Sequence, residues 1–301
     1  MIHLMNKTPQ ITRRTVTASL LLATLSPGSF LLGEQPQTTA DILIAIEKKS
    51  GGRLGYAMLD TATGKSVSHR ATERFPMCST FKFIAAAFIL QRVEKGMEHL
   101  DRKIVFSTSD LVTYSPITEK RTGPNGMTIA ELCLAAITMS DNTAANLLLA
   151  SFGGPSALTQ FLRSIGDPVT RLDRNETTLN EAKPGDPRDT TTPSAMLNNM
   201  HNLLLGDILS PASRDQLTQW LLKNTTGEAR LQAGIPTDWK EGDKTGSGDN
   251  GTTNDIAILW PPNRAPILVA AYLTESPLSA DGRNAILAEI GRVTTNFVHP
   301  S

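Results

Sequence analysis

Strand-like segments stand at both ends of this chain and enclose a long helical middle. Five segments have the residue pattern of strands: residues 54–58, 65–69, 240–247, 254–260 and 266–274. The last three form a predicted meander, in which Asp249-Asn250-Gly251 is the first hairpin turn. Strands at both ends of a helical middle imply one antiparallel sheet that is built from both termini.

Helical patterns fill most of the residues between 79 and 227. A capping box at Thr128 and Glu131, for example, opens an apolar helix that continues to Met139. Two more helices are predicted beside the strands, one at residues 41–49 and one carrying apolar residues from Ile286 to Phe297.

These patterns predict two domains around one cleft. With 301 residues and 40% hydrophobic composition, the chain can bury a large core. We expect an α/β domain with a five-stranded antiparallel sheet flanked by helices, and an all-helical domain inserted into it. The predicted bounds are residues 41–77 and 224–301 for the α/β domain, and residues 78–223 for the helical domain.

The charge balance argues against nucleic acid as a partner. Lys+Arg and Asp+Glu both number 29, so the formal net charge is zero, and aromatic residues are few. The five histidines are scattered without ligand spacing, so the sequence predicts no metal site and no cofactor.

The first 40 residues have the pattern of an export signal. Three basic residues precede the apolar run at 16–25: Lys7, Arg13 and Arg14. That run is too short to span a bilayer comfortably, so we expect the segment to be removed and no stable membrane association to remain. The paired arginines favour a twin-arginine signal, with an ordinary secretory signal as the alternative. Thr38-Thr39-Ala40 is the candidate cleavage site.

Ser79 and Lys82 form the first candidate for chemistry. They are three residues apart at the start of a predicted helix, so the lysine amine can lie beside the serine hydroxyl. A serine hydroxyl is a poor nucleophile until a nearby base activates it, and helix-start N–H groups can stabilise an oxyanion. The alternative is that Ser79 only caps the helix.

Three further clusters have similar alternatives. Ser140-Asp141-Asn142 lies between two helices, where the serine could simply be an N-cap. Lys244-Thr245-Gly246 lies in a strand, where a lysine is usually solvated at an edge. Glu176 and Asn180 lie in a loop, where a carboxylate usually faces solvent.

The order Ser-x-x-Lys, Ser-Asp-Asn, Lys-Thr-Gly resembles the motif set of class A β-lactamases and penicillin-binding proteins. Glu176 with Asn180 narrows the resemblance to class A, and it looks closest to the chromosomal broad-spectrum enzymes of Gram-negative bacteria. The resemblance extends from about Asp41 to the last helix. It implies the β-lactamase/transpeptidase-like fold, a monomer, small β-lactam substrates and a periplasmic location.

The resemblance also assigns the steps of acylation. It implies that Ser79 attacks the lactam carbonyl, while the N–H groups of Ser79 and Ser247 form the oxyanion hole. Ser140 would relay a proton to the departing nitrogen, in a field set by Lys82 and Lys244.

Deacylation is assigned in the same way. Glu176 and Asn180 would position the water that hydrolyses the ester. Whether Lys82 or Glu176 is the base for acylation stays open. Arg174 and Asp189 match an ion pair that flanks this loop. A surface ion pair contributes little energy, but this one would pin the loop whose backbone positions the water.

Substrate binding is expected from residues around the cleft. They are Tyr114 at the rim, Asn142 for the acylamino side chain, and Thr245, Gly246, Ser247 and Arg230, with Lys244, for the carboxylate. Gly246 and Gly248 are expected to leave room for substrate along the strand edge. The alternatives are a half-buried packing role for Tyr114 and a solvated helix-end position for Arg230.

The two cysteines depart from the family. Some members bridge the position of Cys78 to that of Gly248, and others bridge the position of Cys133 to that of Ala86. Because each bridge lacks one half here, we predict two buried reduced thiols and poor carbapenem hydrolysis.

The predicted function is hydrolysis of penicillins and cephalosporins, which confers antibiotic resistance. Two alternatives share the fold or the acylation step: a peptidoglycan D,D-peptidase and a non-hydrolytic penicillin sensor. Glu176 and Asn180 favour the hydrolase, because a D,D-peptidase lacks the deacylating carboxylate and a sensor stays acylated.

Overall fold

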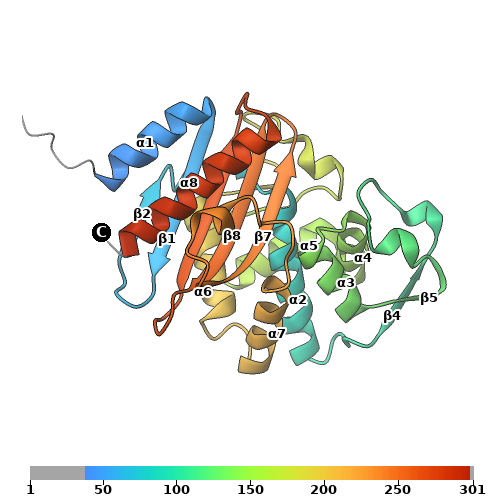
Figure 1. Ribbon diagram of the computed structural model, residues 1–301. Helices are drawn as coiled ribbons and strands as arrows, with labels where there is room; N and C mark the ends of the chain where they lie inside the picture. Colours follow the sequence, from blue (N-terminus) through green and yellow to red (C-terminus); the bar gives the residue numbers. More distant parts are fainter. Residues whose placement is uncertain (1–37, 299–301) are drawn as a thin grey trace, which may run out of the picture. The chain divides into compact units, whose positions relative to one another are not determined.

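A five-stranded antiparallel sheet combines strands from the first and the last parts of the described chain (Figure 1). The computed structural model describes residues 38–298. Strand order in the sheet is β2-β1-β9-β8-β7. The strands are β1 (Arg53–Asp60), β2 (Ser66–His69), β7 (Lys240–Gly248), β8 (Thr252–Trp260) and β9 (Ile267–Thr274). Because β1 pairs with β9 along its whole length, the predicted sheet from both termini is confirmed.

Two helices cover one face of this sheet: α1 (Thr39–Ser50) and α8 (Ala280–Val298) (Figure 1). Their apolar residues share a buried core with the strands, including Leu43 from α1 and Ile290 from α8. The buried Tyr56 hydroxyl is 2.8 Å from Thr294 Oγ1, which satisfies both polar groups inside that core.

The other face of the sheet shares one apolar core with the remaining helices. They are α2 (Phe81–Glu94), α3 (Ile129–Thr138), α4 (Asn142–Phe152), α5 (Gly154–Ser164), α6 (Pro193–Leu204) and α7 (Pro211–Leu221). Most of α2 is buried on every side, as expected for a helix without a polar face. Every residue of β9 is buried as well, since the sheet is covered on both faces.

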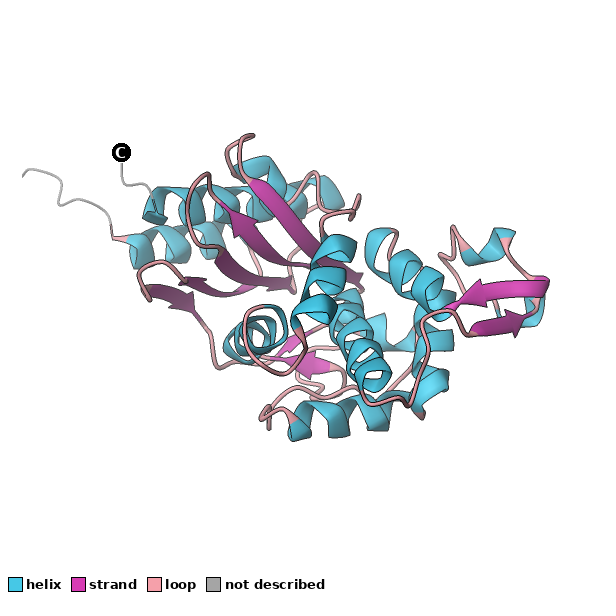
Figure 2. Cartoon of the chain, turned by 90° about the horizontal axis from the view of Figure 1, so that it is seen from below, coloured by secondary structure: helices cyan, strands magenta, loops and turns pink. Residues whose placement is uncertain are grey.

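Two short ribbons were not predicted. β3 (Phe75–Pro76) pairs with β6 (Thr190–Thr191), and β4 (Lys103–Phe106) pairs with β5 (Gly123–Thr128). Figure 2 shows the β4–β5 ribbon beyond the helices, away from the large sheet. Their sequences lack the alternation of a half-buried strand, because β3 and β6 are only two residues long and β5 carries glycine and proline.

The described chain begins with a well-formed cap. Thr38 is the N-cap of α1, and its side chain and that of Asp41 make a reciprocal capping box. Cleavage after Ala40 would remove this cap and the first residues of the helix. The remainder of the predicted signal, residues 1–37, lies outside the described residues. Within residues 38–298, no helix has the length and apolar character needed to cross a membrane.

Candidate active site

Ser79 lies in a 3-10 turn, η1 (Cys78–Thr80), which continues directly into α2. Its hydroxyl donates to Glu176 Oε1 at 3.2 Å. The turn packs against β7 and against η4 (Thr178–Glu181), the short helix that follows Glu176. Ser79 is therefore placed where the start of α2, the sheet edge and the Glu176 loop meet.

Lys82 lies in the first turn of α2, and its side chain is completely buried. Its Nζ contacts Glu176 Oε1 at 3.0 Å, Asn142 Oδ1 at 2.6 Å and the Ser140 carbonyl oxygen at 2.7 Å. Burial lowers the pKa of Lys82, and the Glu176 carboxylate opposes that shift. Ser79 and Lys82 thus both contact one carboxylate oxygen.

Ser140 lies two residues before the start of α4 and does not cap that helix. Asp141 is the N-cap, since its Oδ1 accepts a hydrogen bond from the Ala144 N–H at 2.8 Å. Ser140 has a positive φ of 55°, and its hydroxyl oxygen lies 3.1 Å from Lys244 Nζ and 3.4 Å from Lys82 Nζ. The serine hydroxyl is therefore held between two lysine amines.

Lys244 is completely buried on β7, so the alternative of a solvated edge lysine is wrong. Burial, reinforced by the nearby Lys82 charge, lowers the pKa of Lys244 to about 7. Its Nζ also donates to the Thr245 carbonyl oxygen at 2.9 Å. The charge of this lysine can therefore change near neutral pH.

Glu176 is only 5% exposed, so the alternative of a solvent-facing carboxylate is wrong as well. Asn180 Nδ2 donates to its Oε2 at 2.5 Å. Asn146 on α4 fixes the backbone of Glu176, because its amide donates to the Glu176 carbonyl oxygen at 2.8 Å and accepts from the Glu176 N–H at 2.9 Å. Sequence reasoning missed Asn146. Its position one helical turn after Asn142 was the signal that could have found it.

The Arg174–Asp189 pair is not a surface pair. Arg174 Nε donates to Asp189 Oδ2 at 2.6 Å, and the Asp189 side chain is 1% exposed. Asp189 Oδ1 also accepts from the backbone N–H groups of Asp173 and Arg174 at 2.7 and 2.9 Å. This carboxylate therefore anchors the start of the Glu176 loop from inside the protein.

A cleft with a volume of about 360 Å³ opens beside these groups. Its lining is Ser79, Tyr114, Ser140, Asn142, Asn180, Thr226, Arg230, Thr245, Gly246 and Ser247. Tyr114 is 56% exposed, so it lies at the rim and does not have the half-buried packing role. Thr226 was not predicted. No motif in the sequence contains it, and only the fold brings it to this wall.

Arg230 lies in the loop between α7 and β7, where its guanidinium is bound on several sides. It donates to the carbonyl oxygens of Gly246 and Asn254 at 2.9 and 2.6 Å, to Ser247 Oγ at 2.7 Å and to Asn284 Oδ1 at 3.1 Å. Burial lowers its pKa from the ordinary arginine value. The alternative of a solvated arginine at a helix end is therefore wrong.

Comparison with known proteins agrees with this geometry. The Beta-lactamase enzyme family model matches residues 38–298, which are all the described residues. The chain belongs to the beta-lactamase enzyme family. It is 50% identical to beta-lactamase CTX-M-8 of Citrobacter amalonaticus over 283 residues, which cover 92% of this chain and 97% of that protein.

Solved structures narrow the family to class A. The class A beta-lactamase of the last common ancestor of Gram-negative bacteria (GNCA4) is 64% identical, with a TM-score of 0.86 over 87% of this chain and 99% of that chain. A second ancestral class A beta-lactamase (GNCA) is 63% identical, with a TM-score of 0.85 over 86% of this chain and all of that one. This chain is a class A serine β-lactamase, and the predicted fold is confirmed.

The glycines of β7 in this β-lactamase have a packing role that the sequence did not predict. A Cβ atom at Gly246 would lie 2.7 Å from the Met77 carbonyl oxygen, and one at Gly248 would lie 2.7 Å from the Asn180 carbonyl oxygen. Such contacts are too short for a real side chain. The glycines therefore let β7 approach the Ser79 turn and the Glu176 loop, in addition to any room that they leave for substrate.

Both cysteines of this β-lactamase are free and buried. A Cβ atom at Gly248 would lie 2.7 Å from Cys78 Sγ, so the two positions that some class A relatives bridge face each other here. Cys133 and Ala86 belong to one buried core on the helical side of the sheet. Burial raises the pKa of both thiols, which makes the reactive thiolate form less accessible.

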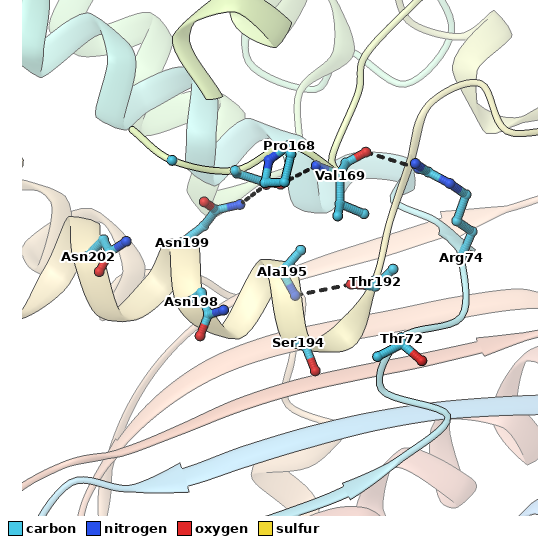
Figure 3. A pocket seen from close by; sticks show the side chains of 12 residues that line it. Thr72, Arg74, Pro168, Val169, Thr192, Ser194, Ala195, Asn198, Asn199 and Asn202 are labelled. Atoms are coloured by element: carbon cyan, nitrogen blue, oxygen red, sulfur yellow. Dashed lines mark hydrogen bonds between the residues drawn. The ribbon is translucent and has the colours of Figure 1, made fainter. Parts of the chain in front are cut away.

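A second hollow of about 380 Å³ lies between the Asp167–Val169 segment, α6 and the Thr72–Arg74 segment (Figure 3). None of the predicted site residues lines it. Arg74 Nη1 donates to the Val169 carbonyl oxygen at 3.0 Å, and Asn199 Nδ2 donates to Asp167 Oδ2 at 2.6 Å. Because these polar groups bind each other, the hollow does not present the converging reactive groups of the cleft beside Ser79.

Proposed function

We propose that this class A enzyme opens the β-lactam ring of penicillins and cephalosporins through an acyl-enzyme on Ser79. The observation that carries the proposal is the contact of Ser79 Oγ and Lys82 Nζ with the same buried oxygen, Glu176 Oε1, at 3.2 and 3.0 Å. A serine hydroxyl that donates to a buried carboxylate has an acceptor for its proton at the moment of attack.

Acylation would use the groups on both sides of Ser79. Glu176 accepts a hydrogen bond from the Ser79 hydroxyl directly, and Lys82 contacts the same carboxylate oxygen, so either Glu176 or Lys82 would serve as the base. The N–H groups of Ser79 and Ser247 would stabilise the developing oxyanion. Ser140, held between Lys82 and Lys244, would pass a proton to the departing lactam nitrogen.

Deacylation would depend on Glu176 alone. Asn180 and Asn146 fix its carboxylate and its backbone, and a water activated between Glu176 and Asn180 would attack the ester. This arrangement favours hydrolysis over a D,D-peptidase or a penicillin sensor, neither of which needs a deacylating carboxylate. Acylation would thus use Lys82 or Glu176 as its base, whereas deacylation would use Glu176.

Substrate selection would rest on the wall formed by β7 and Arg230. Thr245, Ser247 and the guanidinium would bind the ring carboxylate, and Asn142 would hold the acylamino side chain, with Tyr114 at the rim. Because Cys78 lacks the bridge that some relatives have, we propose poor hydrolysis of carbapenems.

Location and assembly complete the proposal. We propose export to the periplasm with removal of the signal, and action there as a monomer. The α/β part (residues 41–77 and 224–301) and the helical part (residues 78–223) would act as two lobes around the cleft.

One experiment separates the candidate functions. Purified enzyme that lacks the signal is mixed with a chromogenic cephalosporin, and the coloured product is followed against enzyme concentration. Continuous turnover supports the hydrolase. A single burst equal to the enzyme concentration would identify a penicillin sensor or a slow peptidase. The absence of any reaction would contradict acylation of Ser79.

A further inference from the structure

A chain of polar side chains runs behind the carboxylate-binding wall of the cleft. Thr245 Oγ1 is 2.5 Å from Thr226 Oγ1, which lies 2.9 Å from Asn224 Oδ1. Asn224 Nδ2 is 2.6 Å from Asp243 Oδ2. Thr245 and Asp243 lie on β7, whereas Thr226 and Asn224 belong to the loop after α7. The chain thus connects a hydroxyl in the cleft to a buried carboxylate.

The direction of the Asn224 amide is fixed by its neighbours. The Thr226 backbone N–H donates to Asn224 Oδ1 at 3.3 Å, and a backbone N–H can only donate. The amide nitrogen must therefore face Asp243, whose carboxylate accepts its hydrogen bond. This leaves Asn224 Oδ1 as an acceptor toward the Thr226 hydroxyl.

The Thr226 hydroxyl has only one proton to donate. When it donates to Asn224 Oδ1, Thr245 must donate to Thr226, and the Thr245 proton points away from the cleft. When Thr226 donates to Thr245 instead, the Thr245 proton is free to point into the cleft. The 2.5 Å contact between the two hydroxyl oxygens permits either arrangement.

Ser247 carries the other hydroxyl on this wall, and the direction of its hydrogen bond to its partner is fixed. Its oxygen accepts from Arg230 Nη2 at 2.7 Å, and a guanidinium can only donate. The Ser247 proton therefore does not point toward Arg230. Of the two hydroxyls that face the substrate carboxylate, Thr245 is the one whose proton direction depends on a neighbour.

We propose that Thr226 is a positioning residue that turns the Thr245 hydroxyl toward the substrate carboxylate. This inference rests on the proposed function. On binding, the anion accepts from Thr245, Thr226 donates to the Thr245 oxygen, and Asn224 Oδ1 keeps the Thr226 N–H as its donor. The Thr226 hydroxyl then polarises the Thr245 hydroxyl and strengthens its bond to the anion.

A double-mutant cycle on Thr226 and Thr245 tests this role. Thr226→Val removes the hydroxyl at nearly constant shape and leaves the Thr245 oxygen without its donor. We expect kcat/KM for benzylpenicillin to fall roughly fivefold, as for one neutral hydrogen bond, with most of the loss in KM. In a Thr245→Val background, the same change should lower kcat/KM by less than about twofold, because the hydroxyl that Thr226 would position is absent.

Two further variants separate the hydroxyl from packing. Thr226→Ser keeps the hydroxyl and should recover most of the lost efficiency. Thr225→Val makes the same replacement one position away, where the hydroxyl donates to the Thr138 carbonyl oxygen, and should leave kcat/KM within about twofold of the parent. Thermal unfolding of each variant establishes that all are folded at the assay temperature.

The outcomes that overturn the inference are distinct from a failure of the proposed function. An equal fivefold loss with and without the Thr245 hydroxyl would show that Thr226 acts by itself, and a Thr226→Ser variant as weak as Thr226→Val would assign the effect to shape. If the parent does not turn over benzylpenicillin, the proposed function fails. The same cycle is then measured as the Kd of benzylpenicillin in a Ser79→Ala background by calorimetry, where independent effects of Thr226 and Thr245 would overturn the positioning role.

Discussion

Lys82 and Glu176 contact each other at 3.0 Å, but the segments that carry them are held in different ways. The α2 helix of Lys82 lies in an apolar core, and its own side chains Phe83, Ile84 and Ile89 are fully buried there. The Glu176 loop is held by polar contacts from Asn146, Arg174 and Asp189. Substitutions at the buried positions of α2 should therefore lower the free energy of unfolding. Substitutions of the polar residues around the Glu176 loop should mainly change the rate of the reaction.

The largest expected effect comes from the carboxylate of Glu176. In Glu176→Gln the water that attacks the ester loses its base, whereas Lys82 remains beside Ser79 for acylation. We expect release of product to slow by roughly three orders of magnitude, within the range for loss of a general base. Mass spectrometry should show a persistent adduct on Ser79 with a penicillin.

Glu181→Gln is the matched control, because it makes the same replacement in the same loop on a half-exposed side chain that contacts Arg174. It should accumulate no adduct. If Glu176→Gln turns over penicillin at the parental rate, the deacylation role is wrong.

A substitution at a buried position of α2 tests whether its apolar packing acts on stability. Ile84→Ala deletes a fully buried side chain and should lower the free energy of unfolding by about 2–5 kcal/mol. Because the polar contacts remain, kcat of the folded fraction should stay close to that of the parent. Denaturant unfolding and kcat at low temperature measure the two quantities.

Ile44→Ala provides the control for this change, since Ile44 is 55% exposed on α1 and should cost no more than about 0.5 kcal/mol. A large fall in kcat with little loss of stability in Ile84→Ala would contradict the view that the apolar packing of α2 acts on stability and the polar contacts act on the reaction.

The third effect tests whether the wall formed by β7 and Arg230 binds the substrate carboxylate. Arg230→Ala should lower kcat/KM by roughly one to two orders of magnitude for both a penicillin and a cephalosporin, as expected for the loss of charge-assisted hydrogen bonds. Arg230→Lys keeps a charge but cannot reproduce the planar set of donors, so it should recover only part of the loss. If both substrates keep parental efficiency with alanine, their carboxylate is held elsewhere.

A smaller effect is expected from the anchor of the Glu176 loop. Arg174→Ser removes the guanidinium from buried Asp189, which keeps two backbone donors. We expect about a tenfold loss of penicillin turnover, a higher ratio of bulky-cephalosporin to penicillin activity, and a stability loss of about 1–3 kcal/mol. Steady-state kinetics on both substrates and thermal unfolding measure these quantities.

Arg171→Ser is the matched control, because Arg171 pairs with Asp173 at 2.5 Å on a more exposed site. It should change stability by less than about 1 kcal/mol and leave the substrate ratio unaltered. If Arg174→Ser leaves the ratio of cephalosporin to penicillin activity unchanged, the Arg174–Asp189 pair does not contribute to specificity.

The smallest effect is a pH dependence. The pKa of Lys244 is lowered to about 7, so its charge is present below that pH and is lost as pH rises through it. We expect kcat/KM for penicillin, which reports the free enzyme, to decline above about pH 7 as this charge disappears. In Lys244→Arg the charge persists, so the decline should begin at higher pH. Identical pH profiles for the two enzymes would exclude Lys244 as the titrating group.

Local sequence patterns were sufficient for the order of the elements. Strand-like runs and turn residues predicted the five sheet strands, and caps such as Thr128 predicted helix starts, because these signals depend on neighbours within a few residues. The two short ribbons escaped prediction, since strands such as Phe75–Pro76 carry too few residues for any periodic pattern.

The sequence by itself also determined which residue types were available for chemistry, through three motifs and the Glu176–Asn180 pair. Only the tertiary structure decided what those side chains do. Asp141 takes the helix cap and frees Ser140, and burial between elements distant in sequence lowers the pKa of Lys244. Asn146 and Thr226 enter the site only through folding. Burial and hydrogen-bond partners depend on contacts between distant segments, and no local pattern records such contacts.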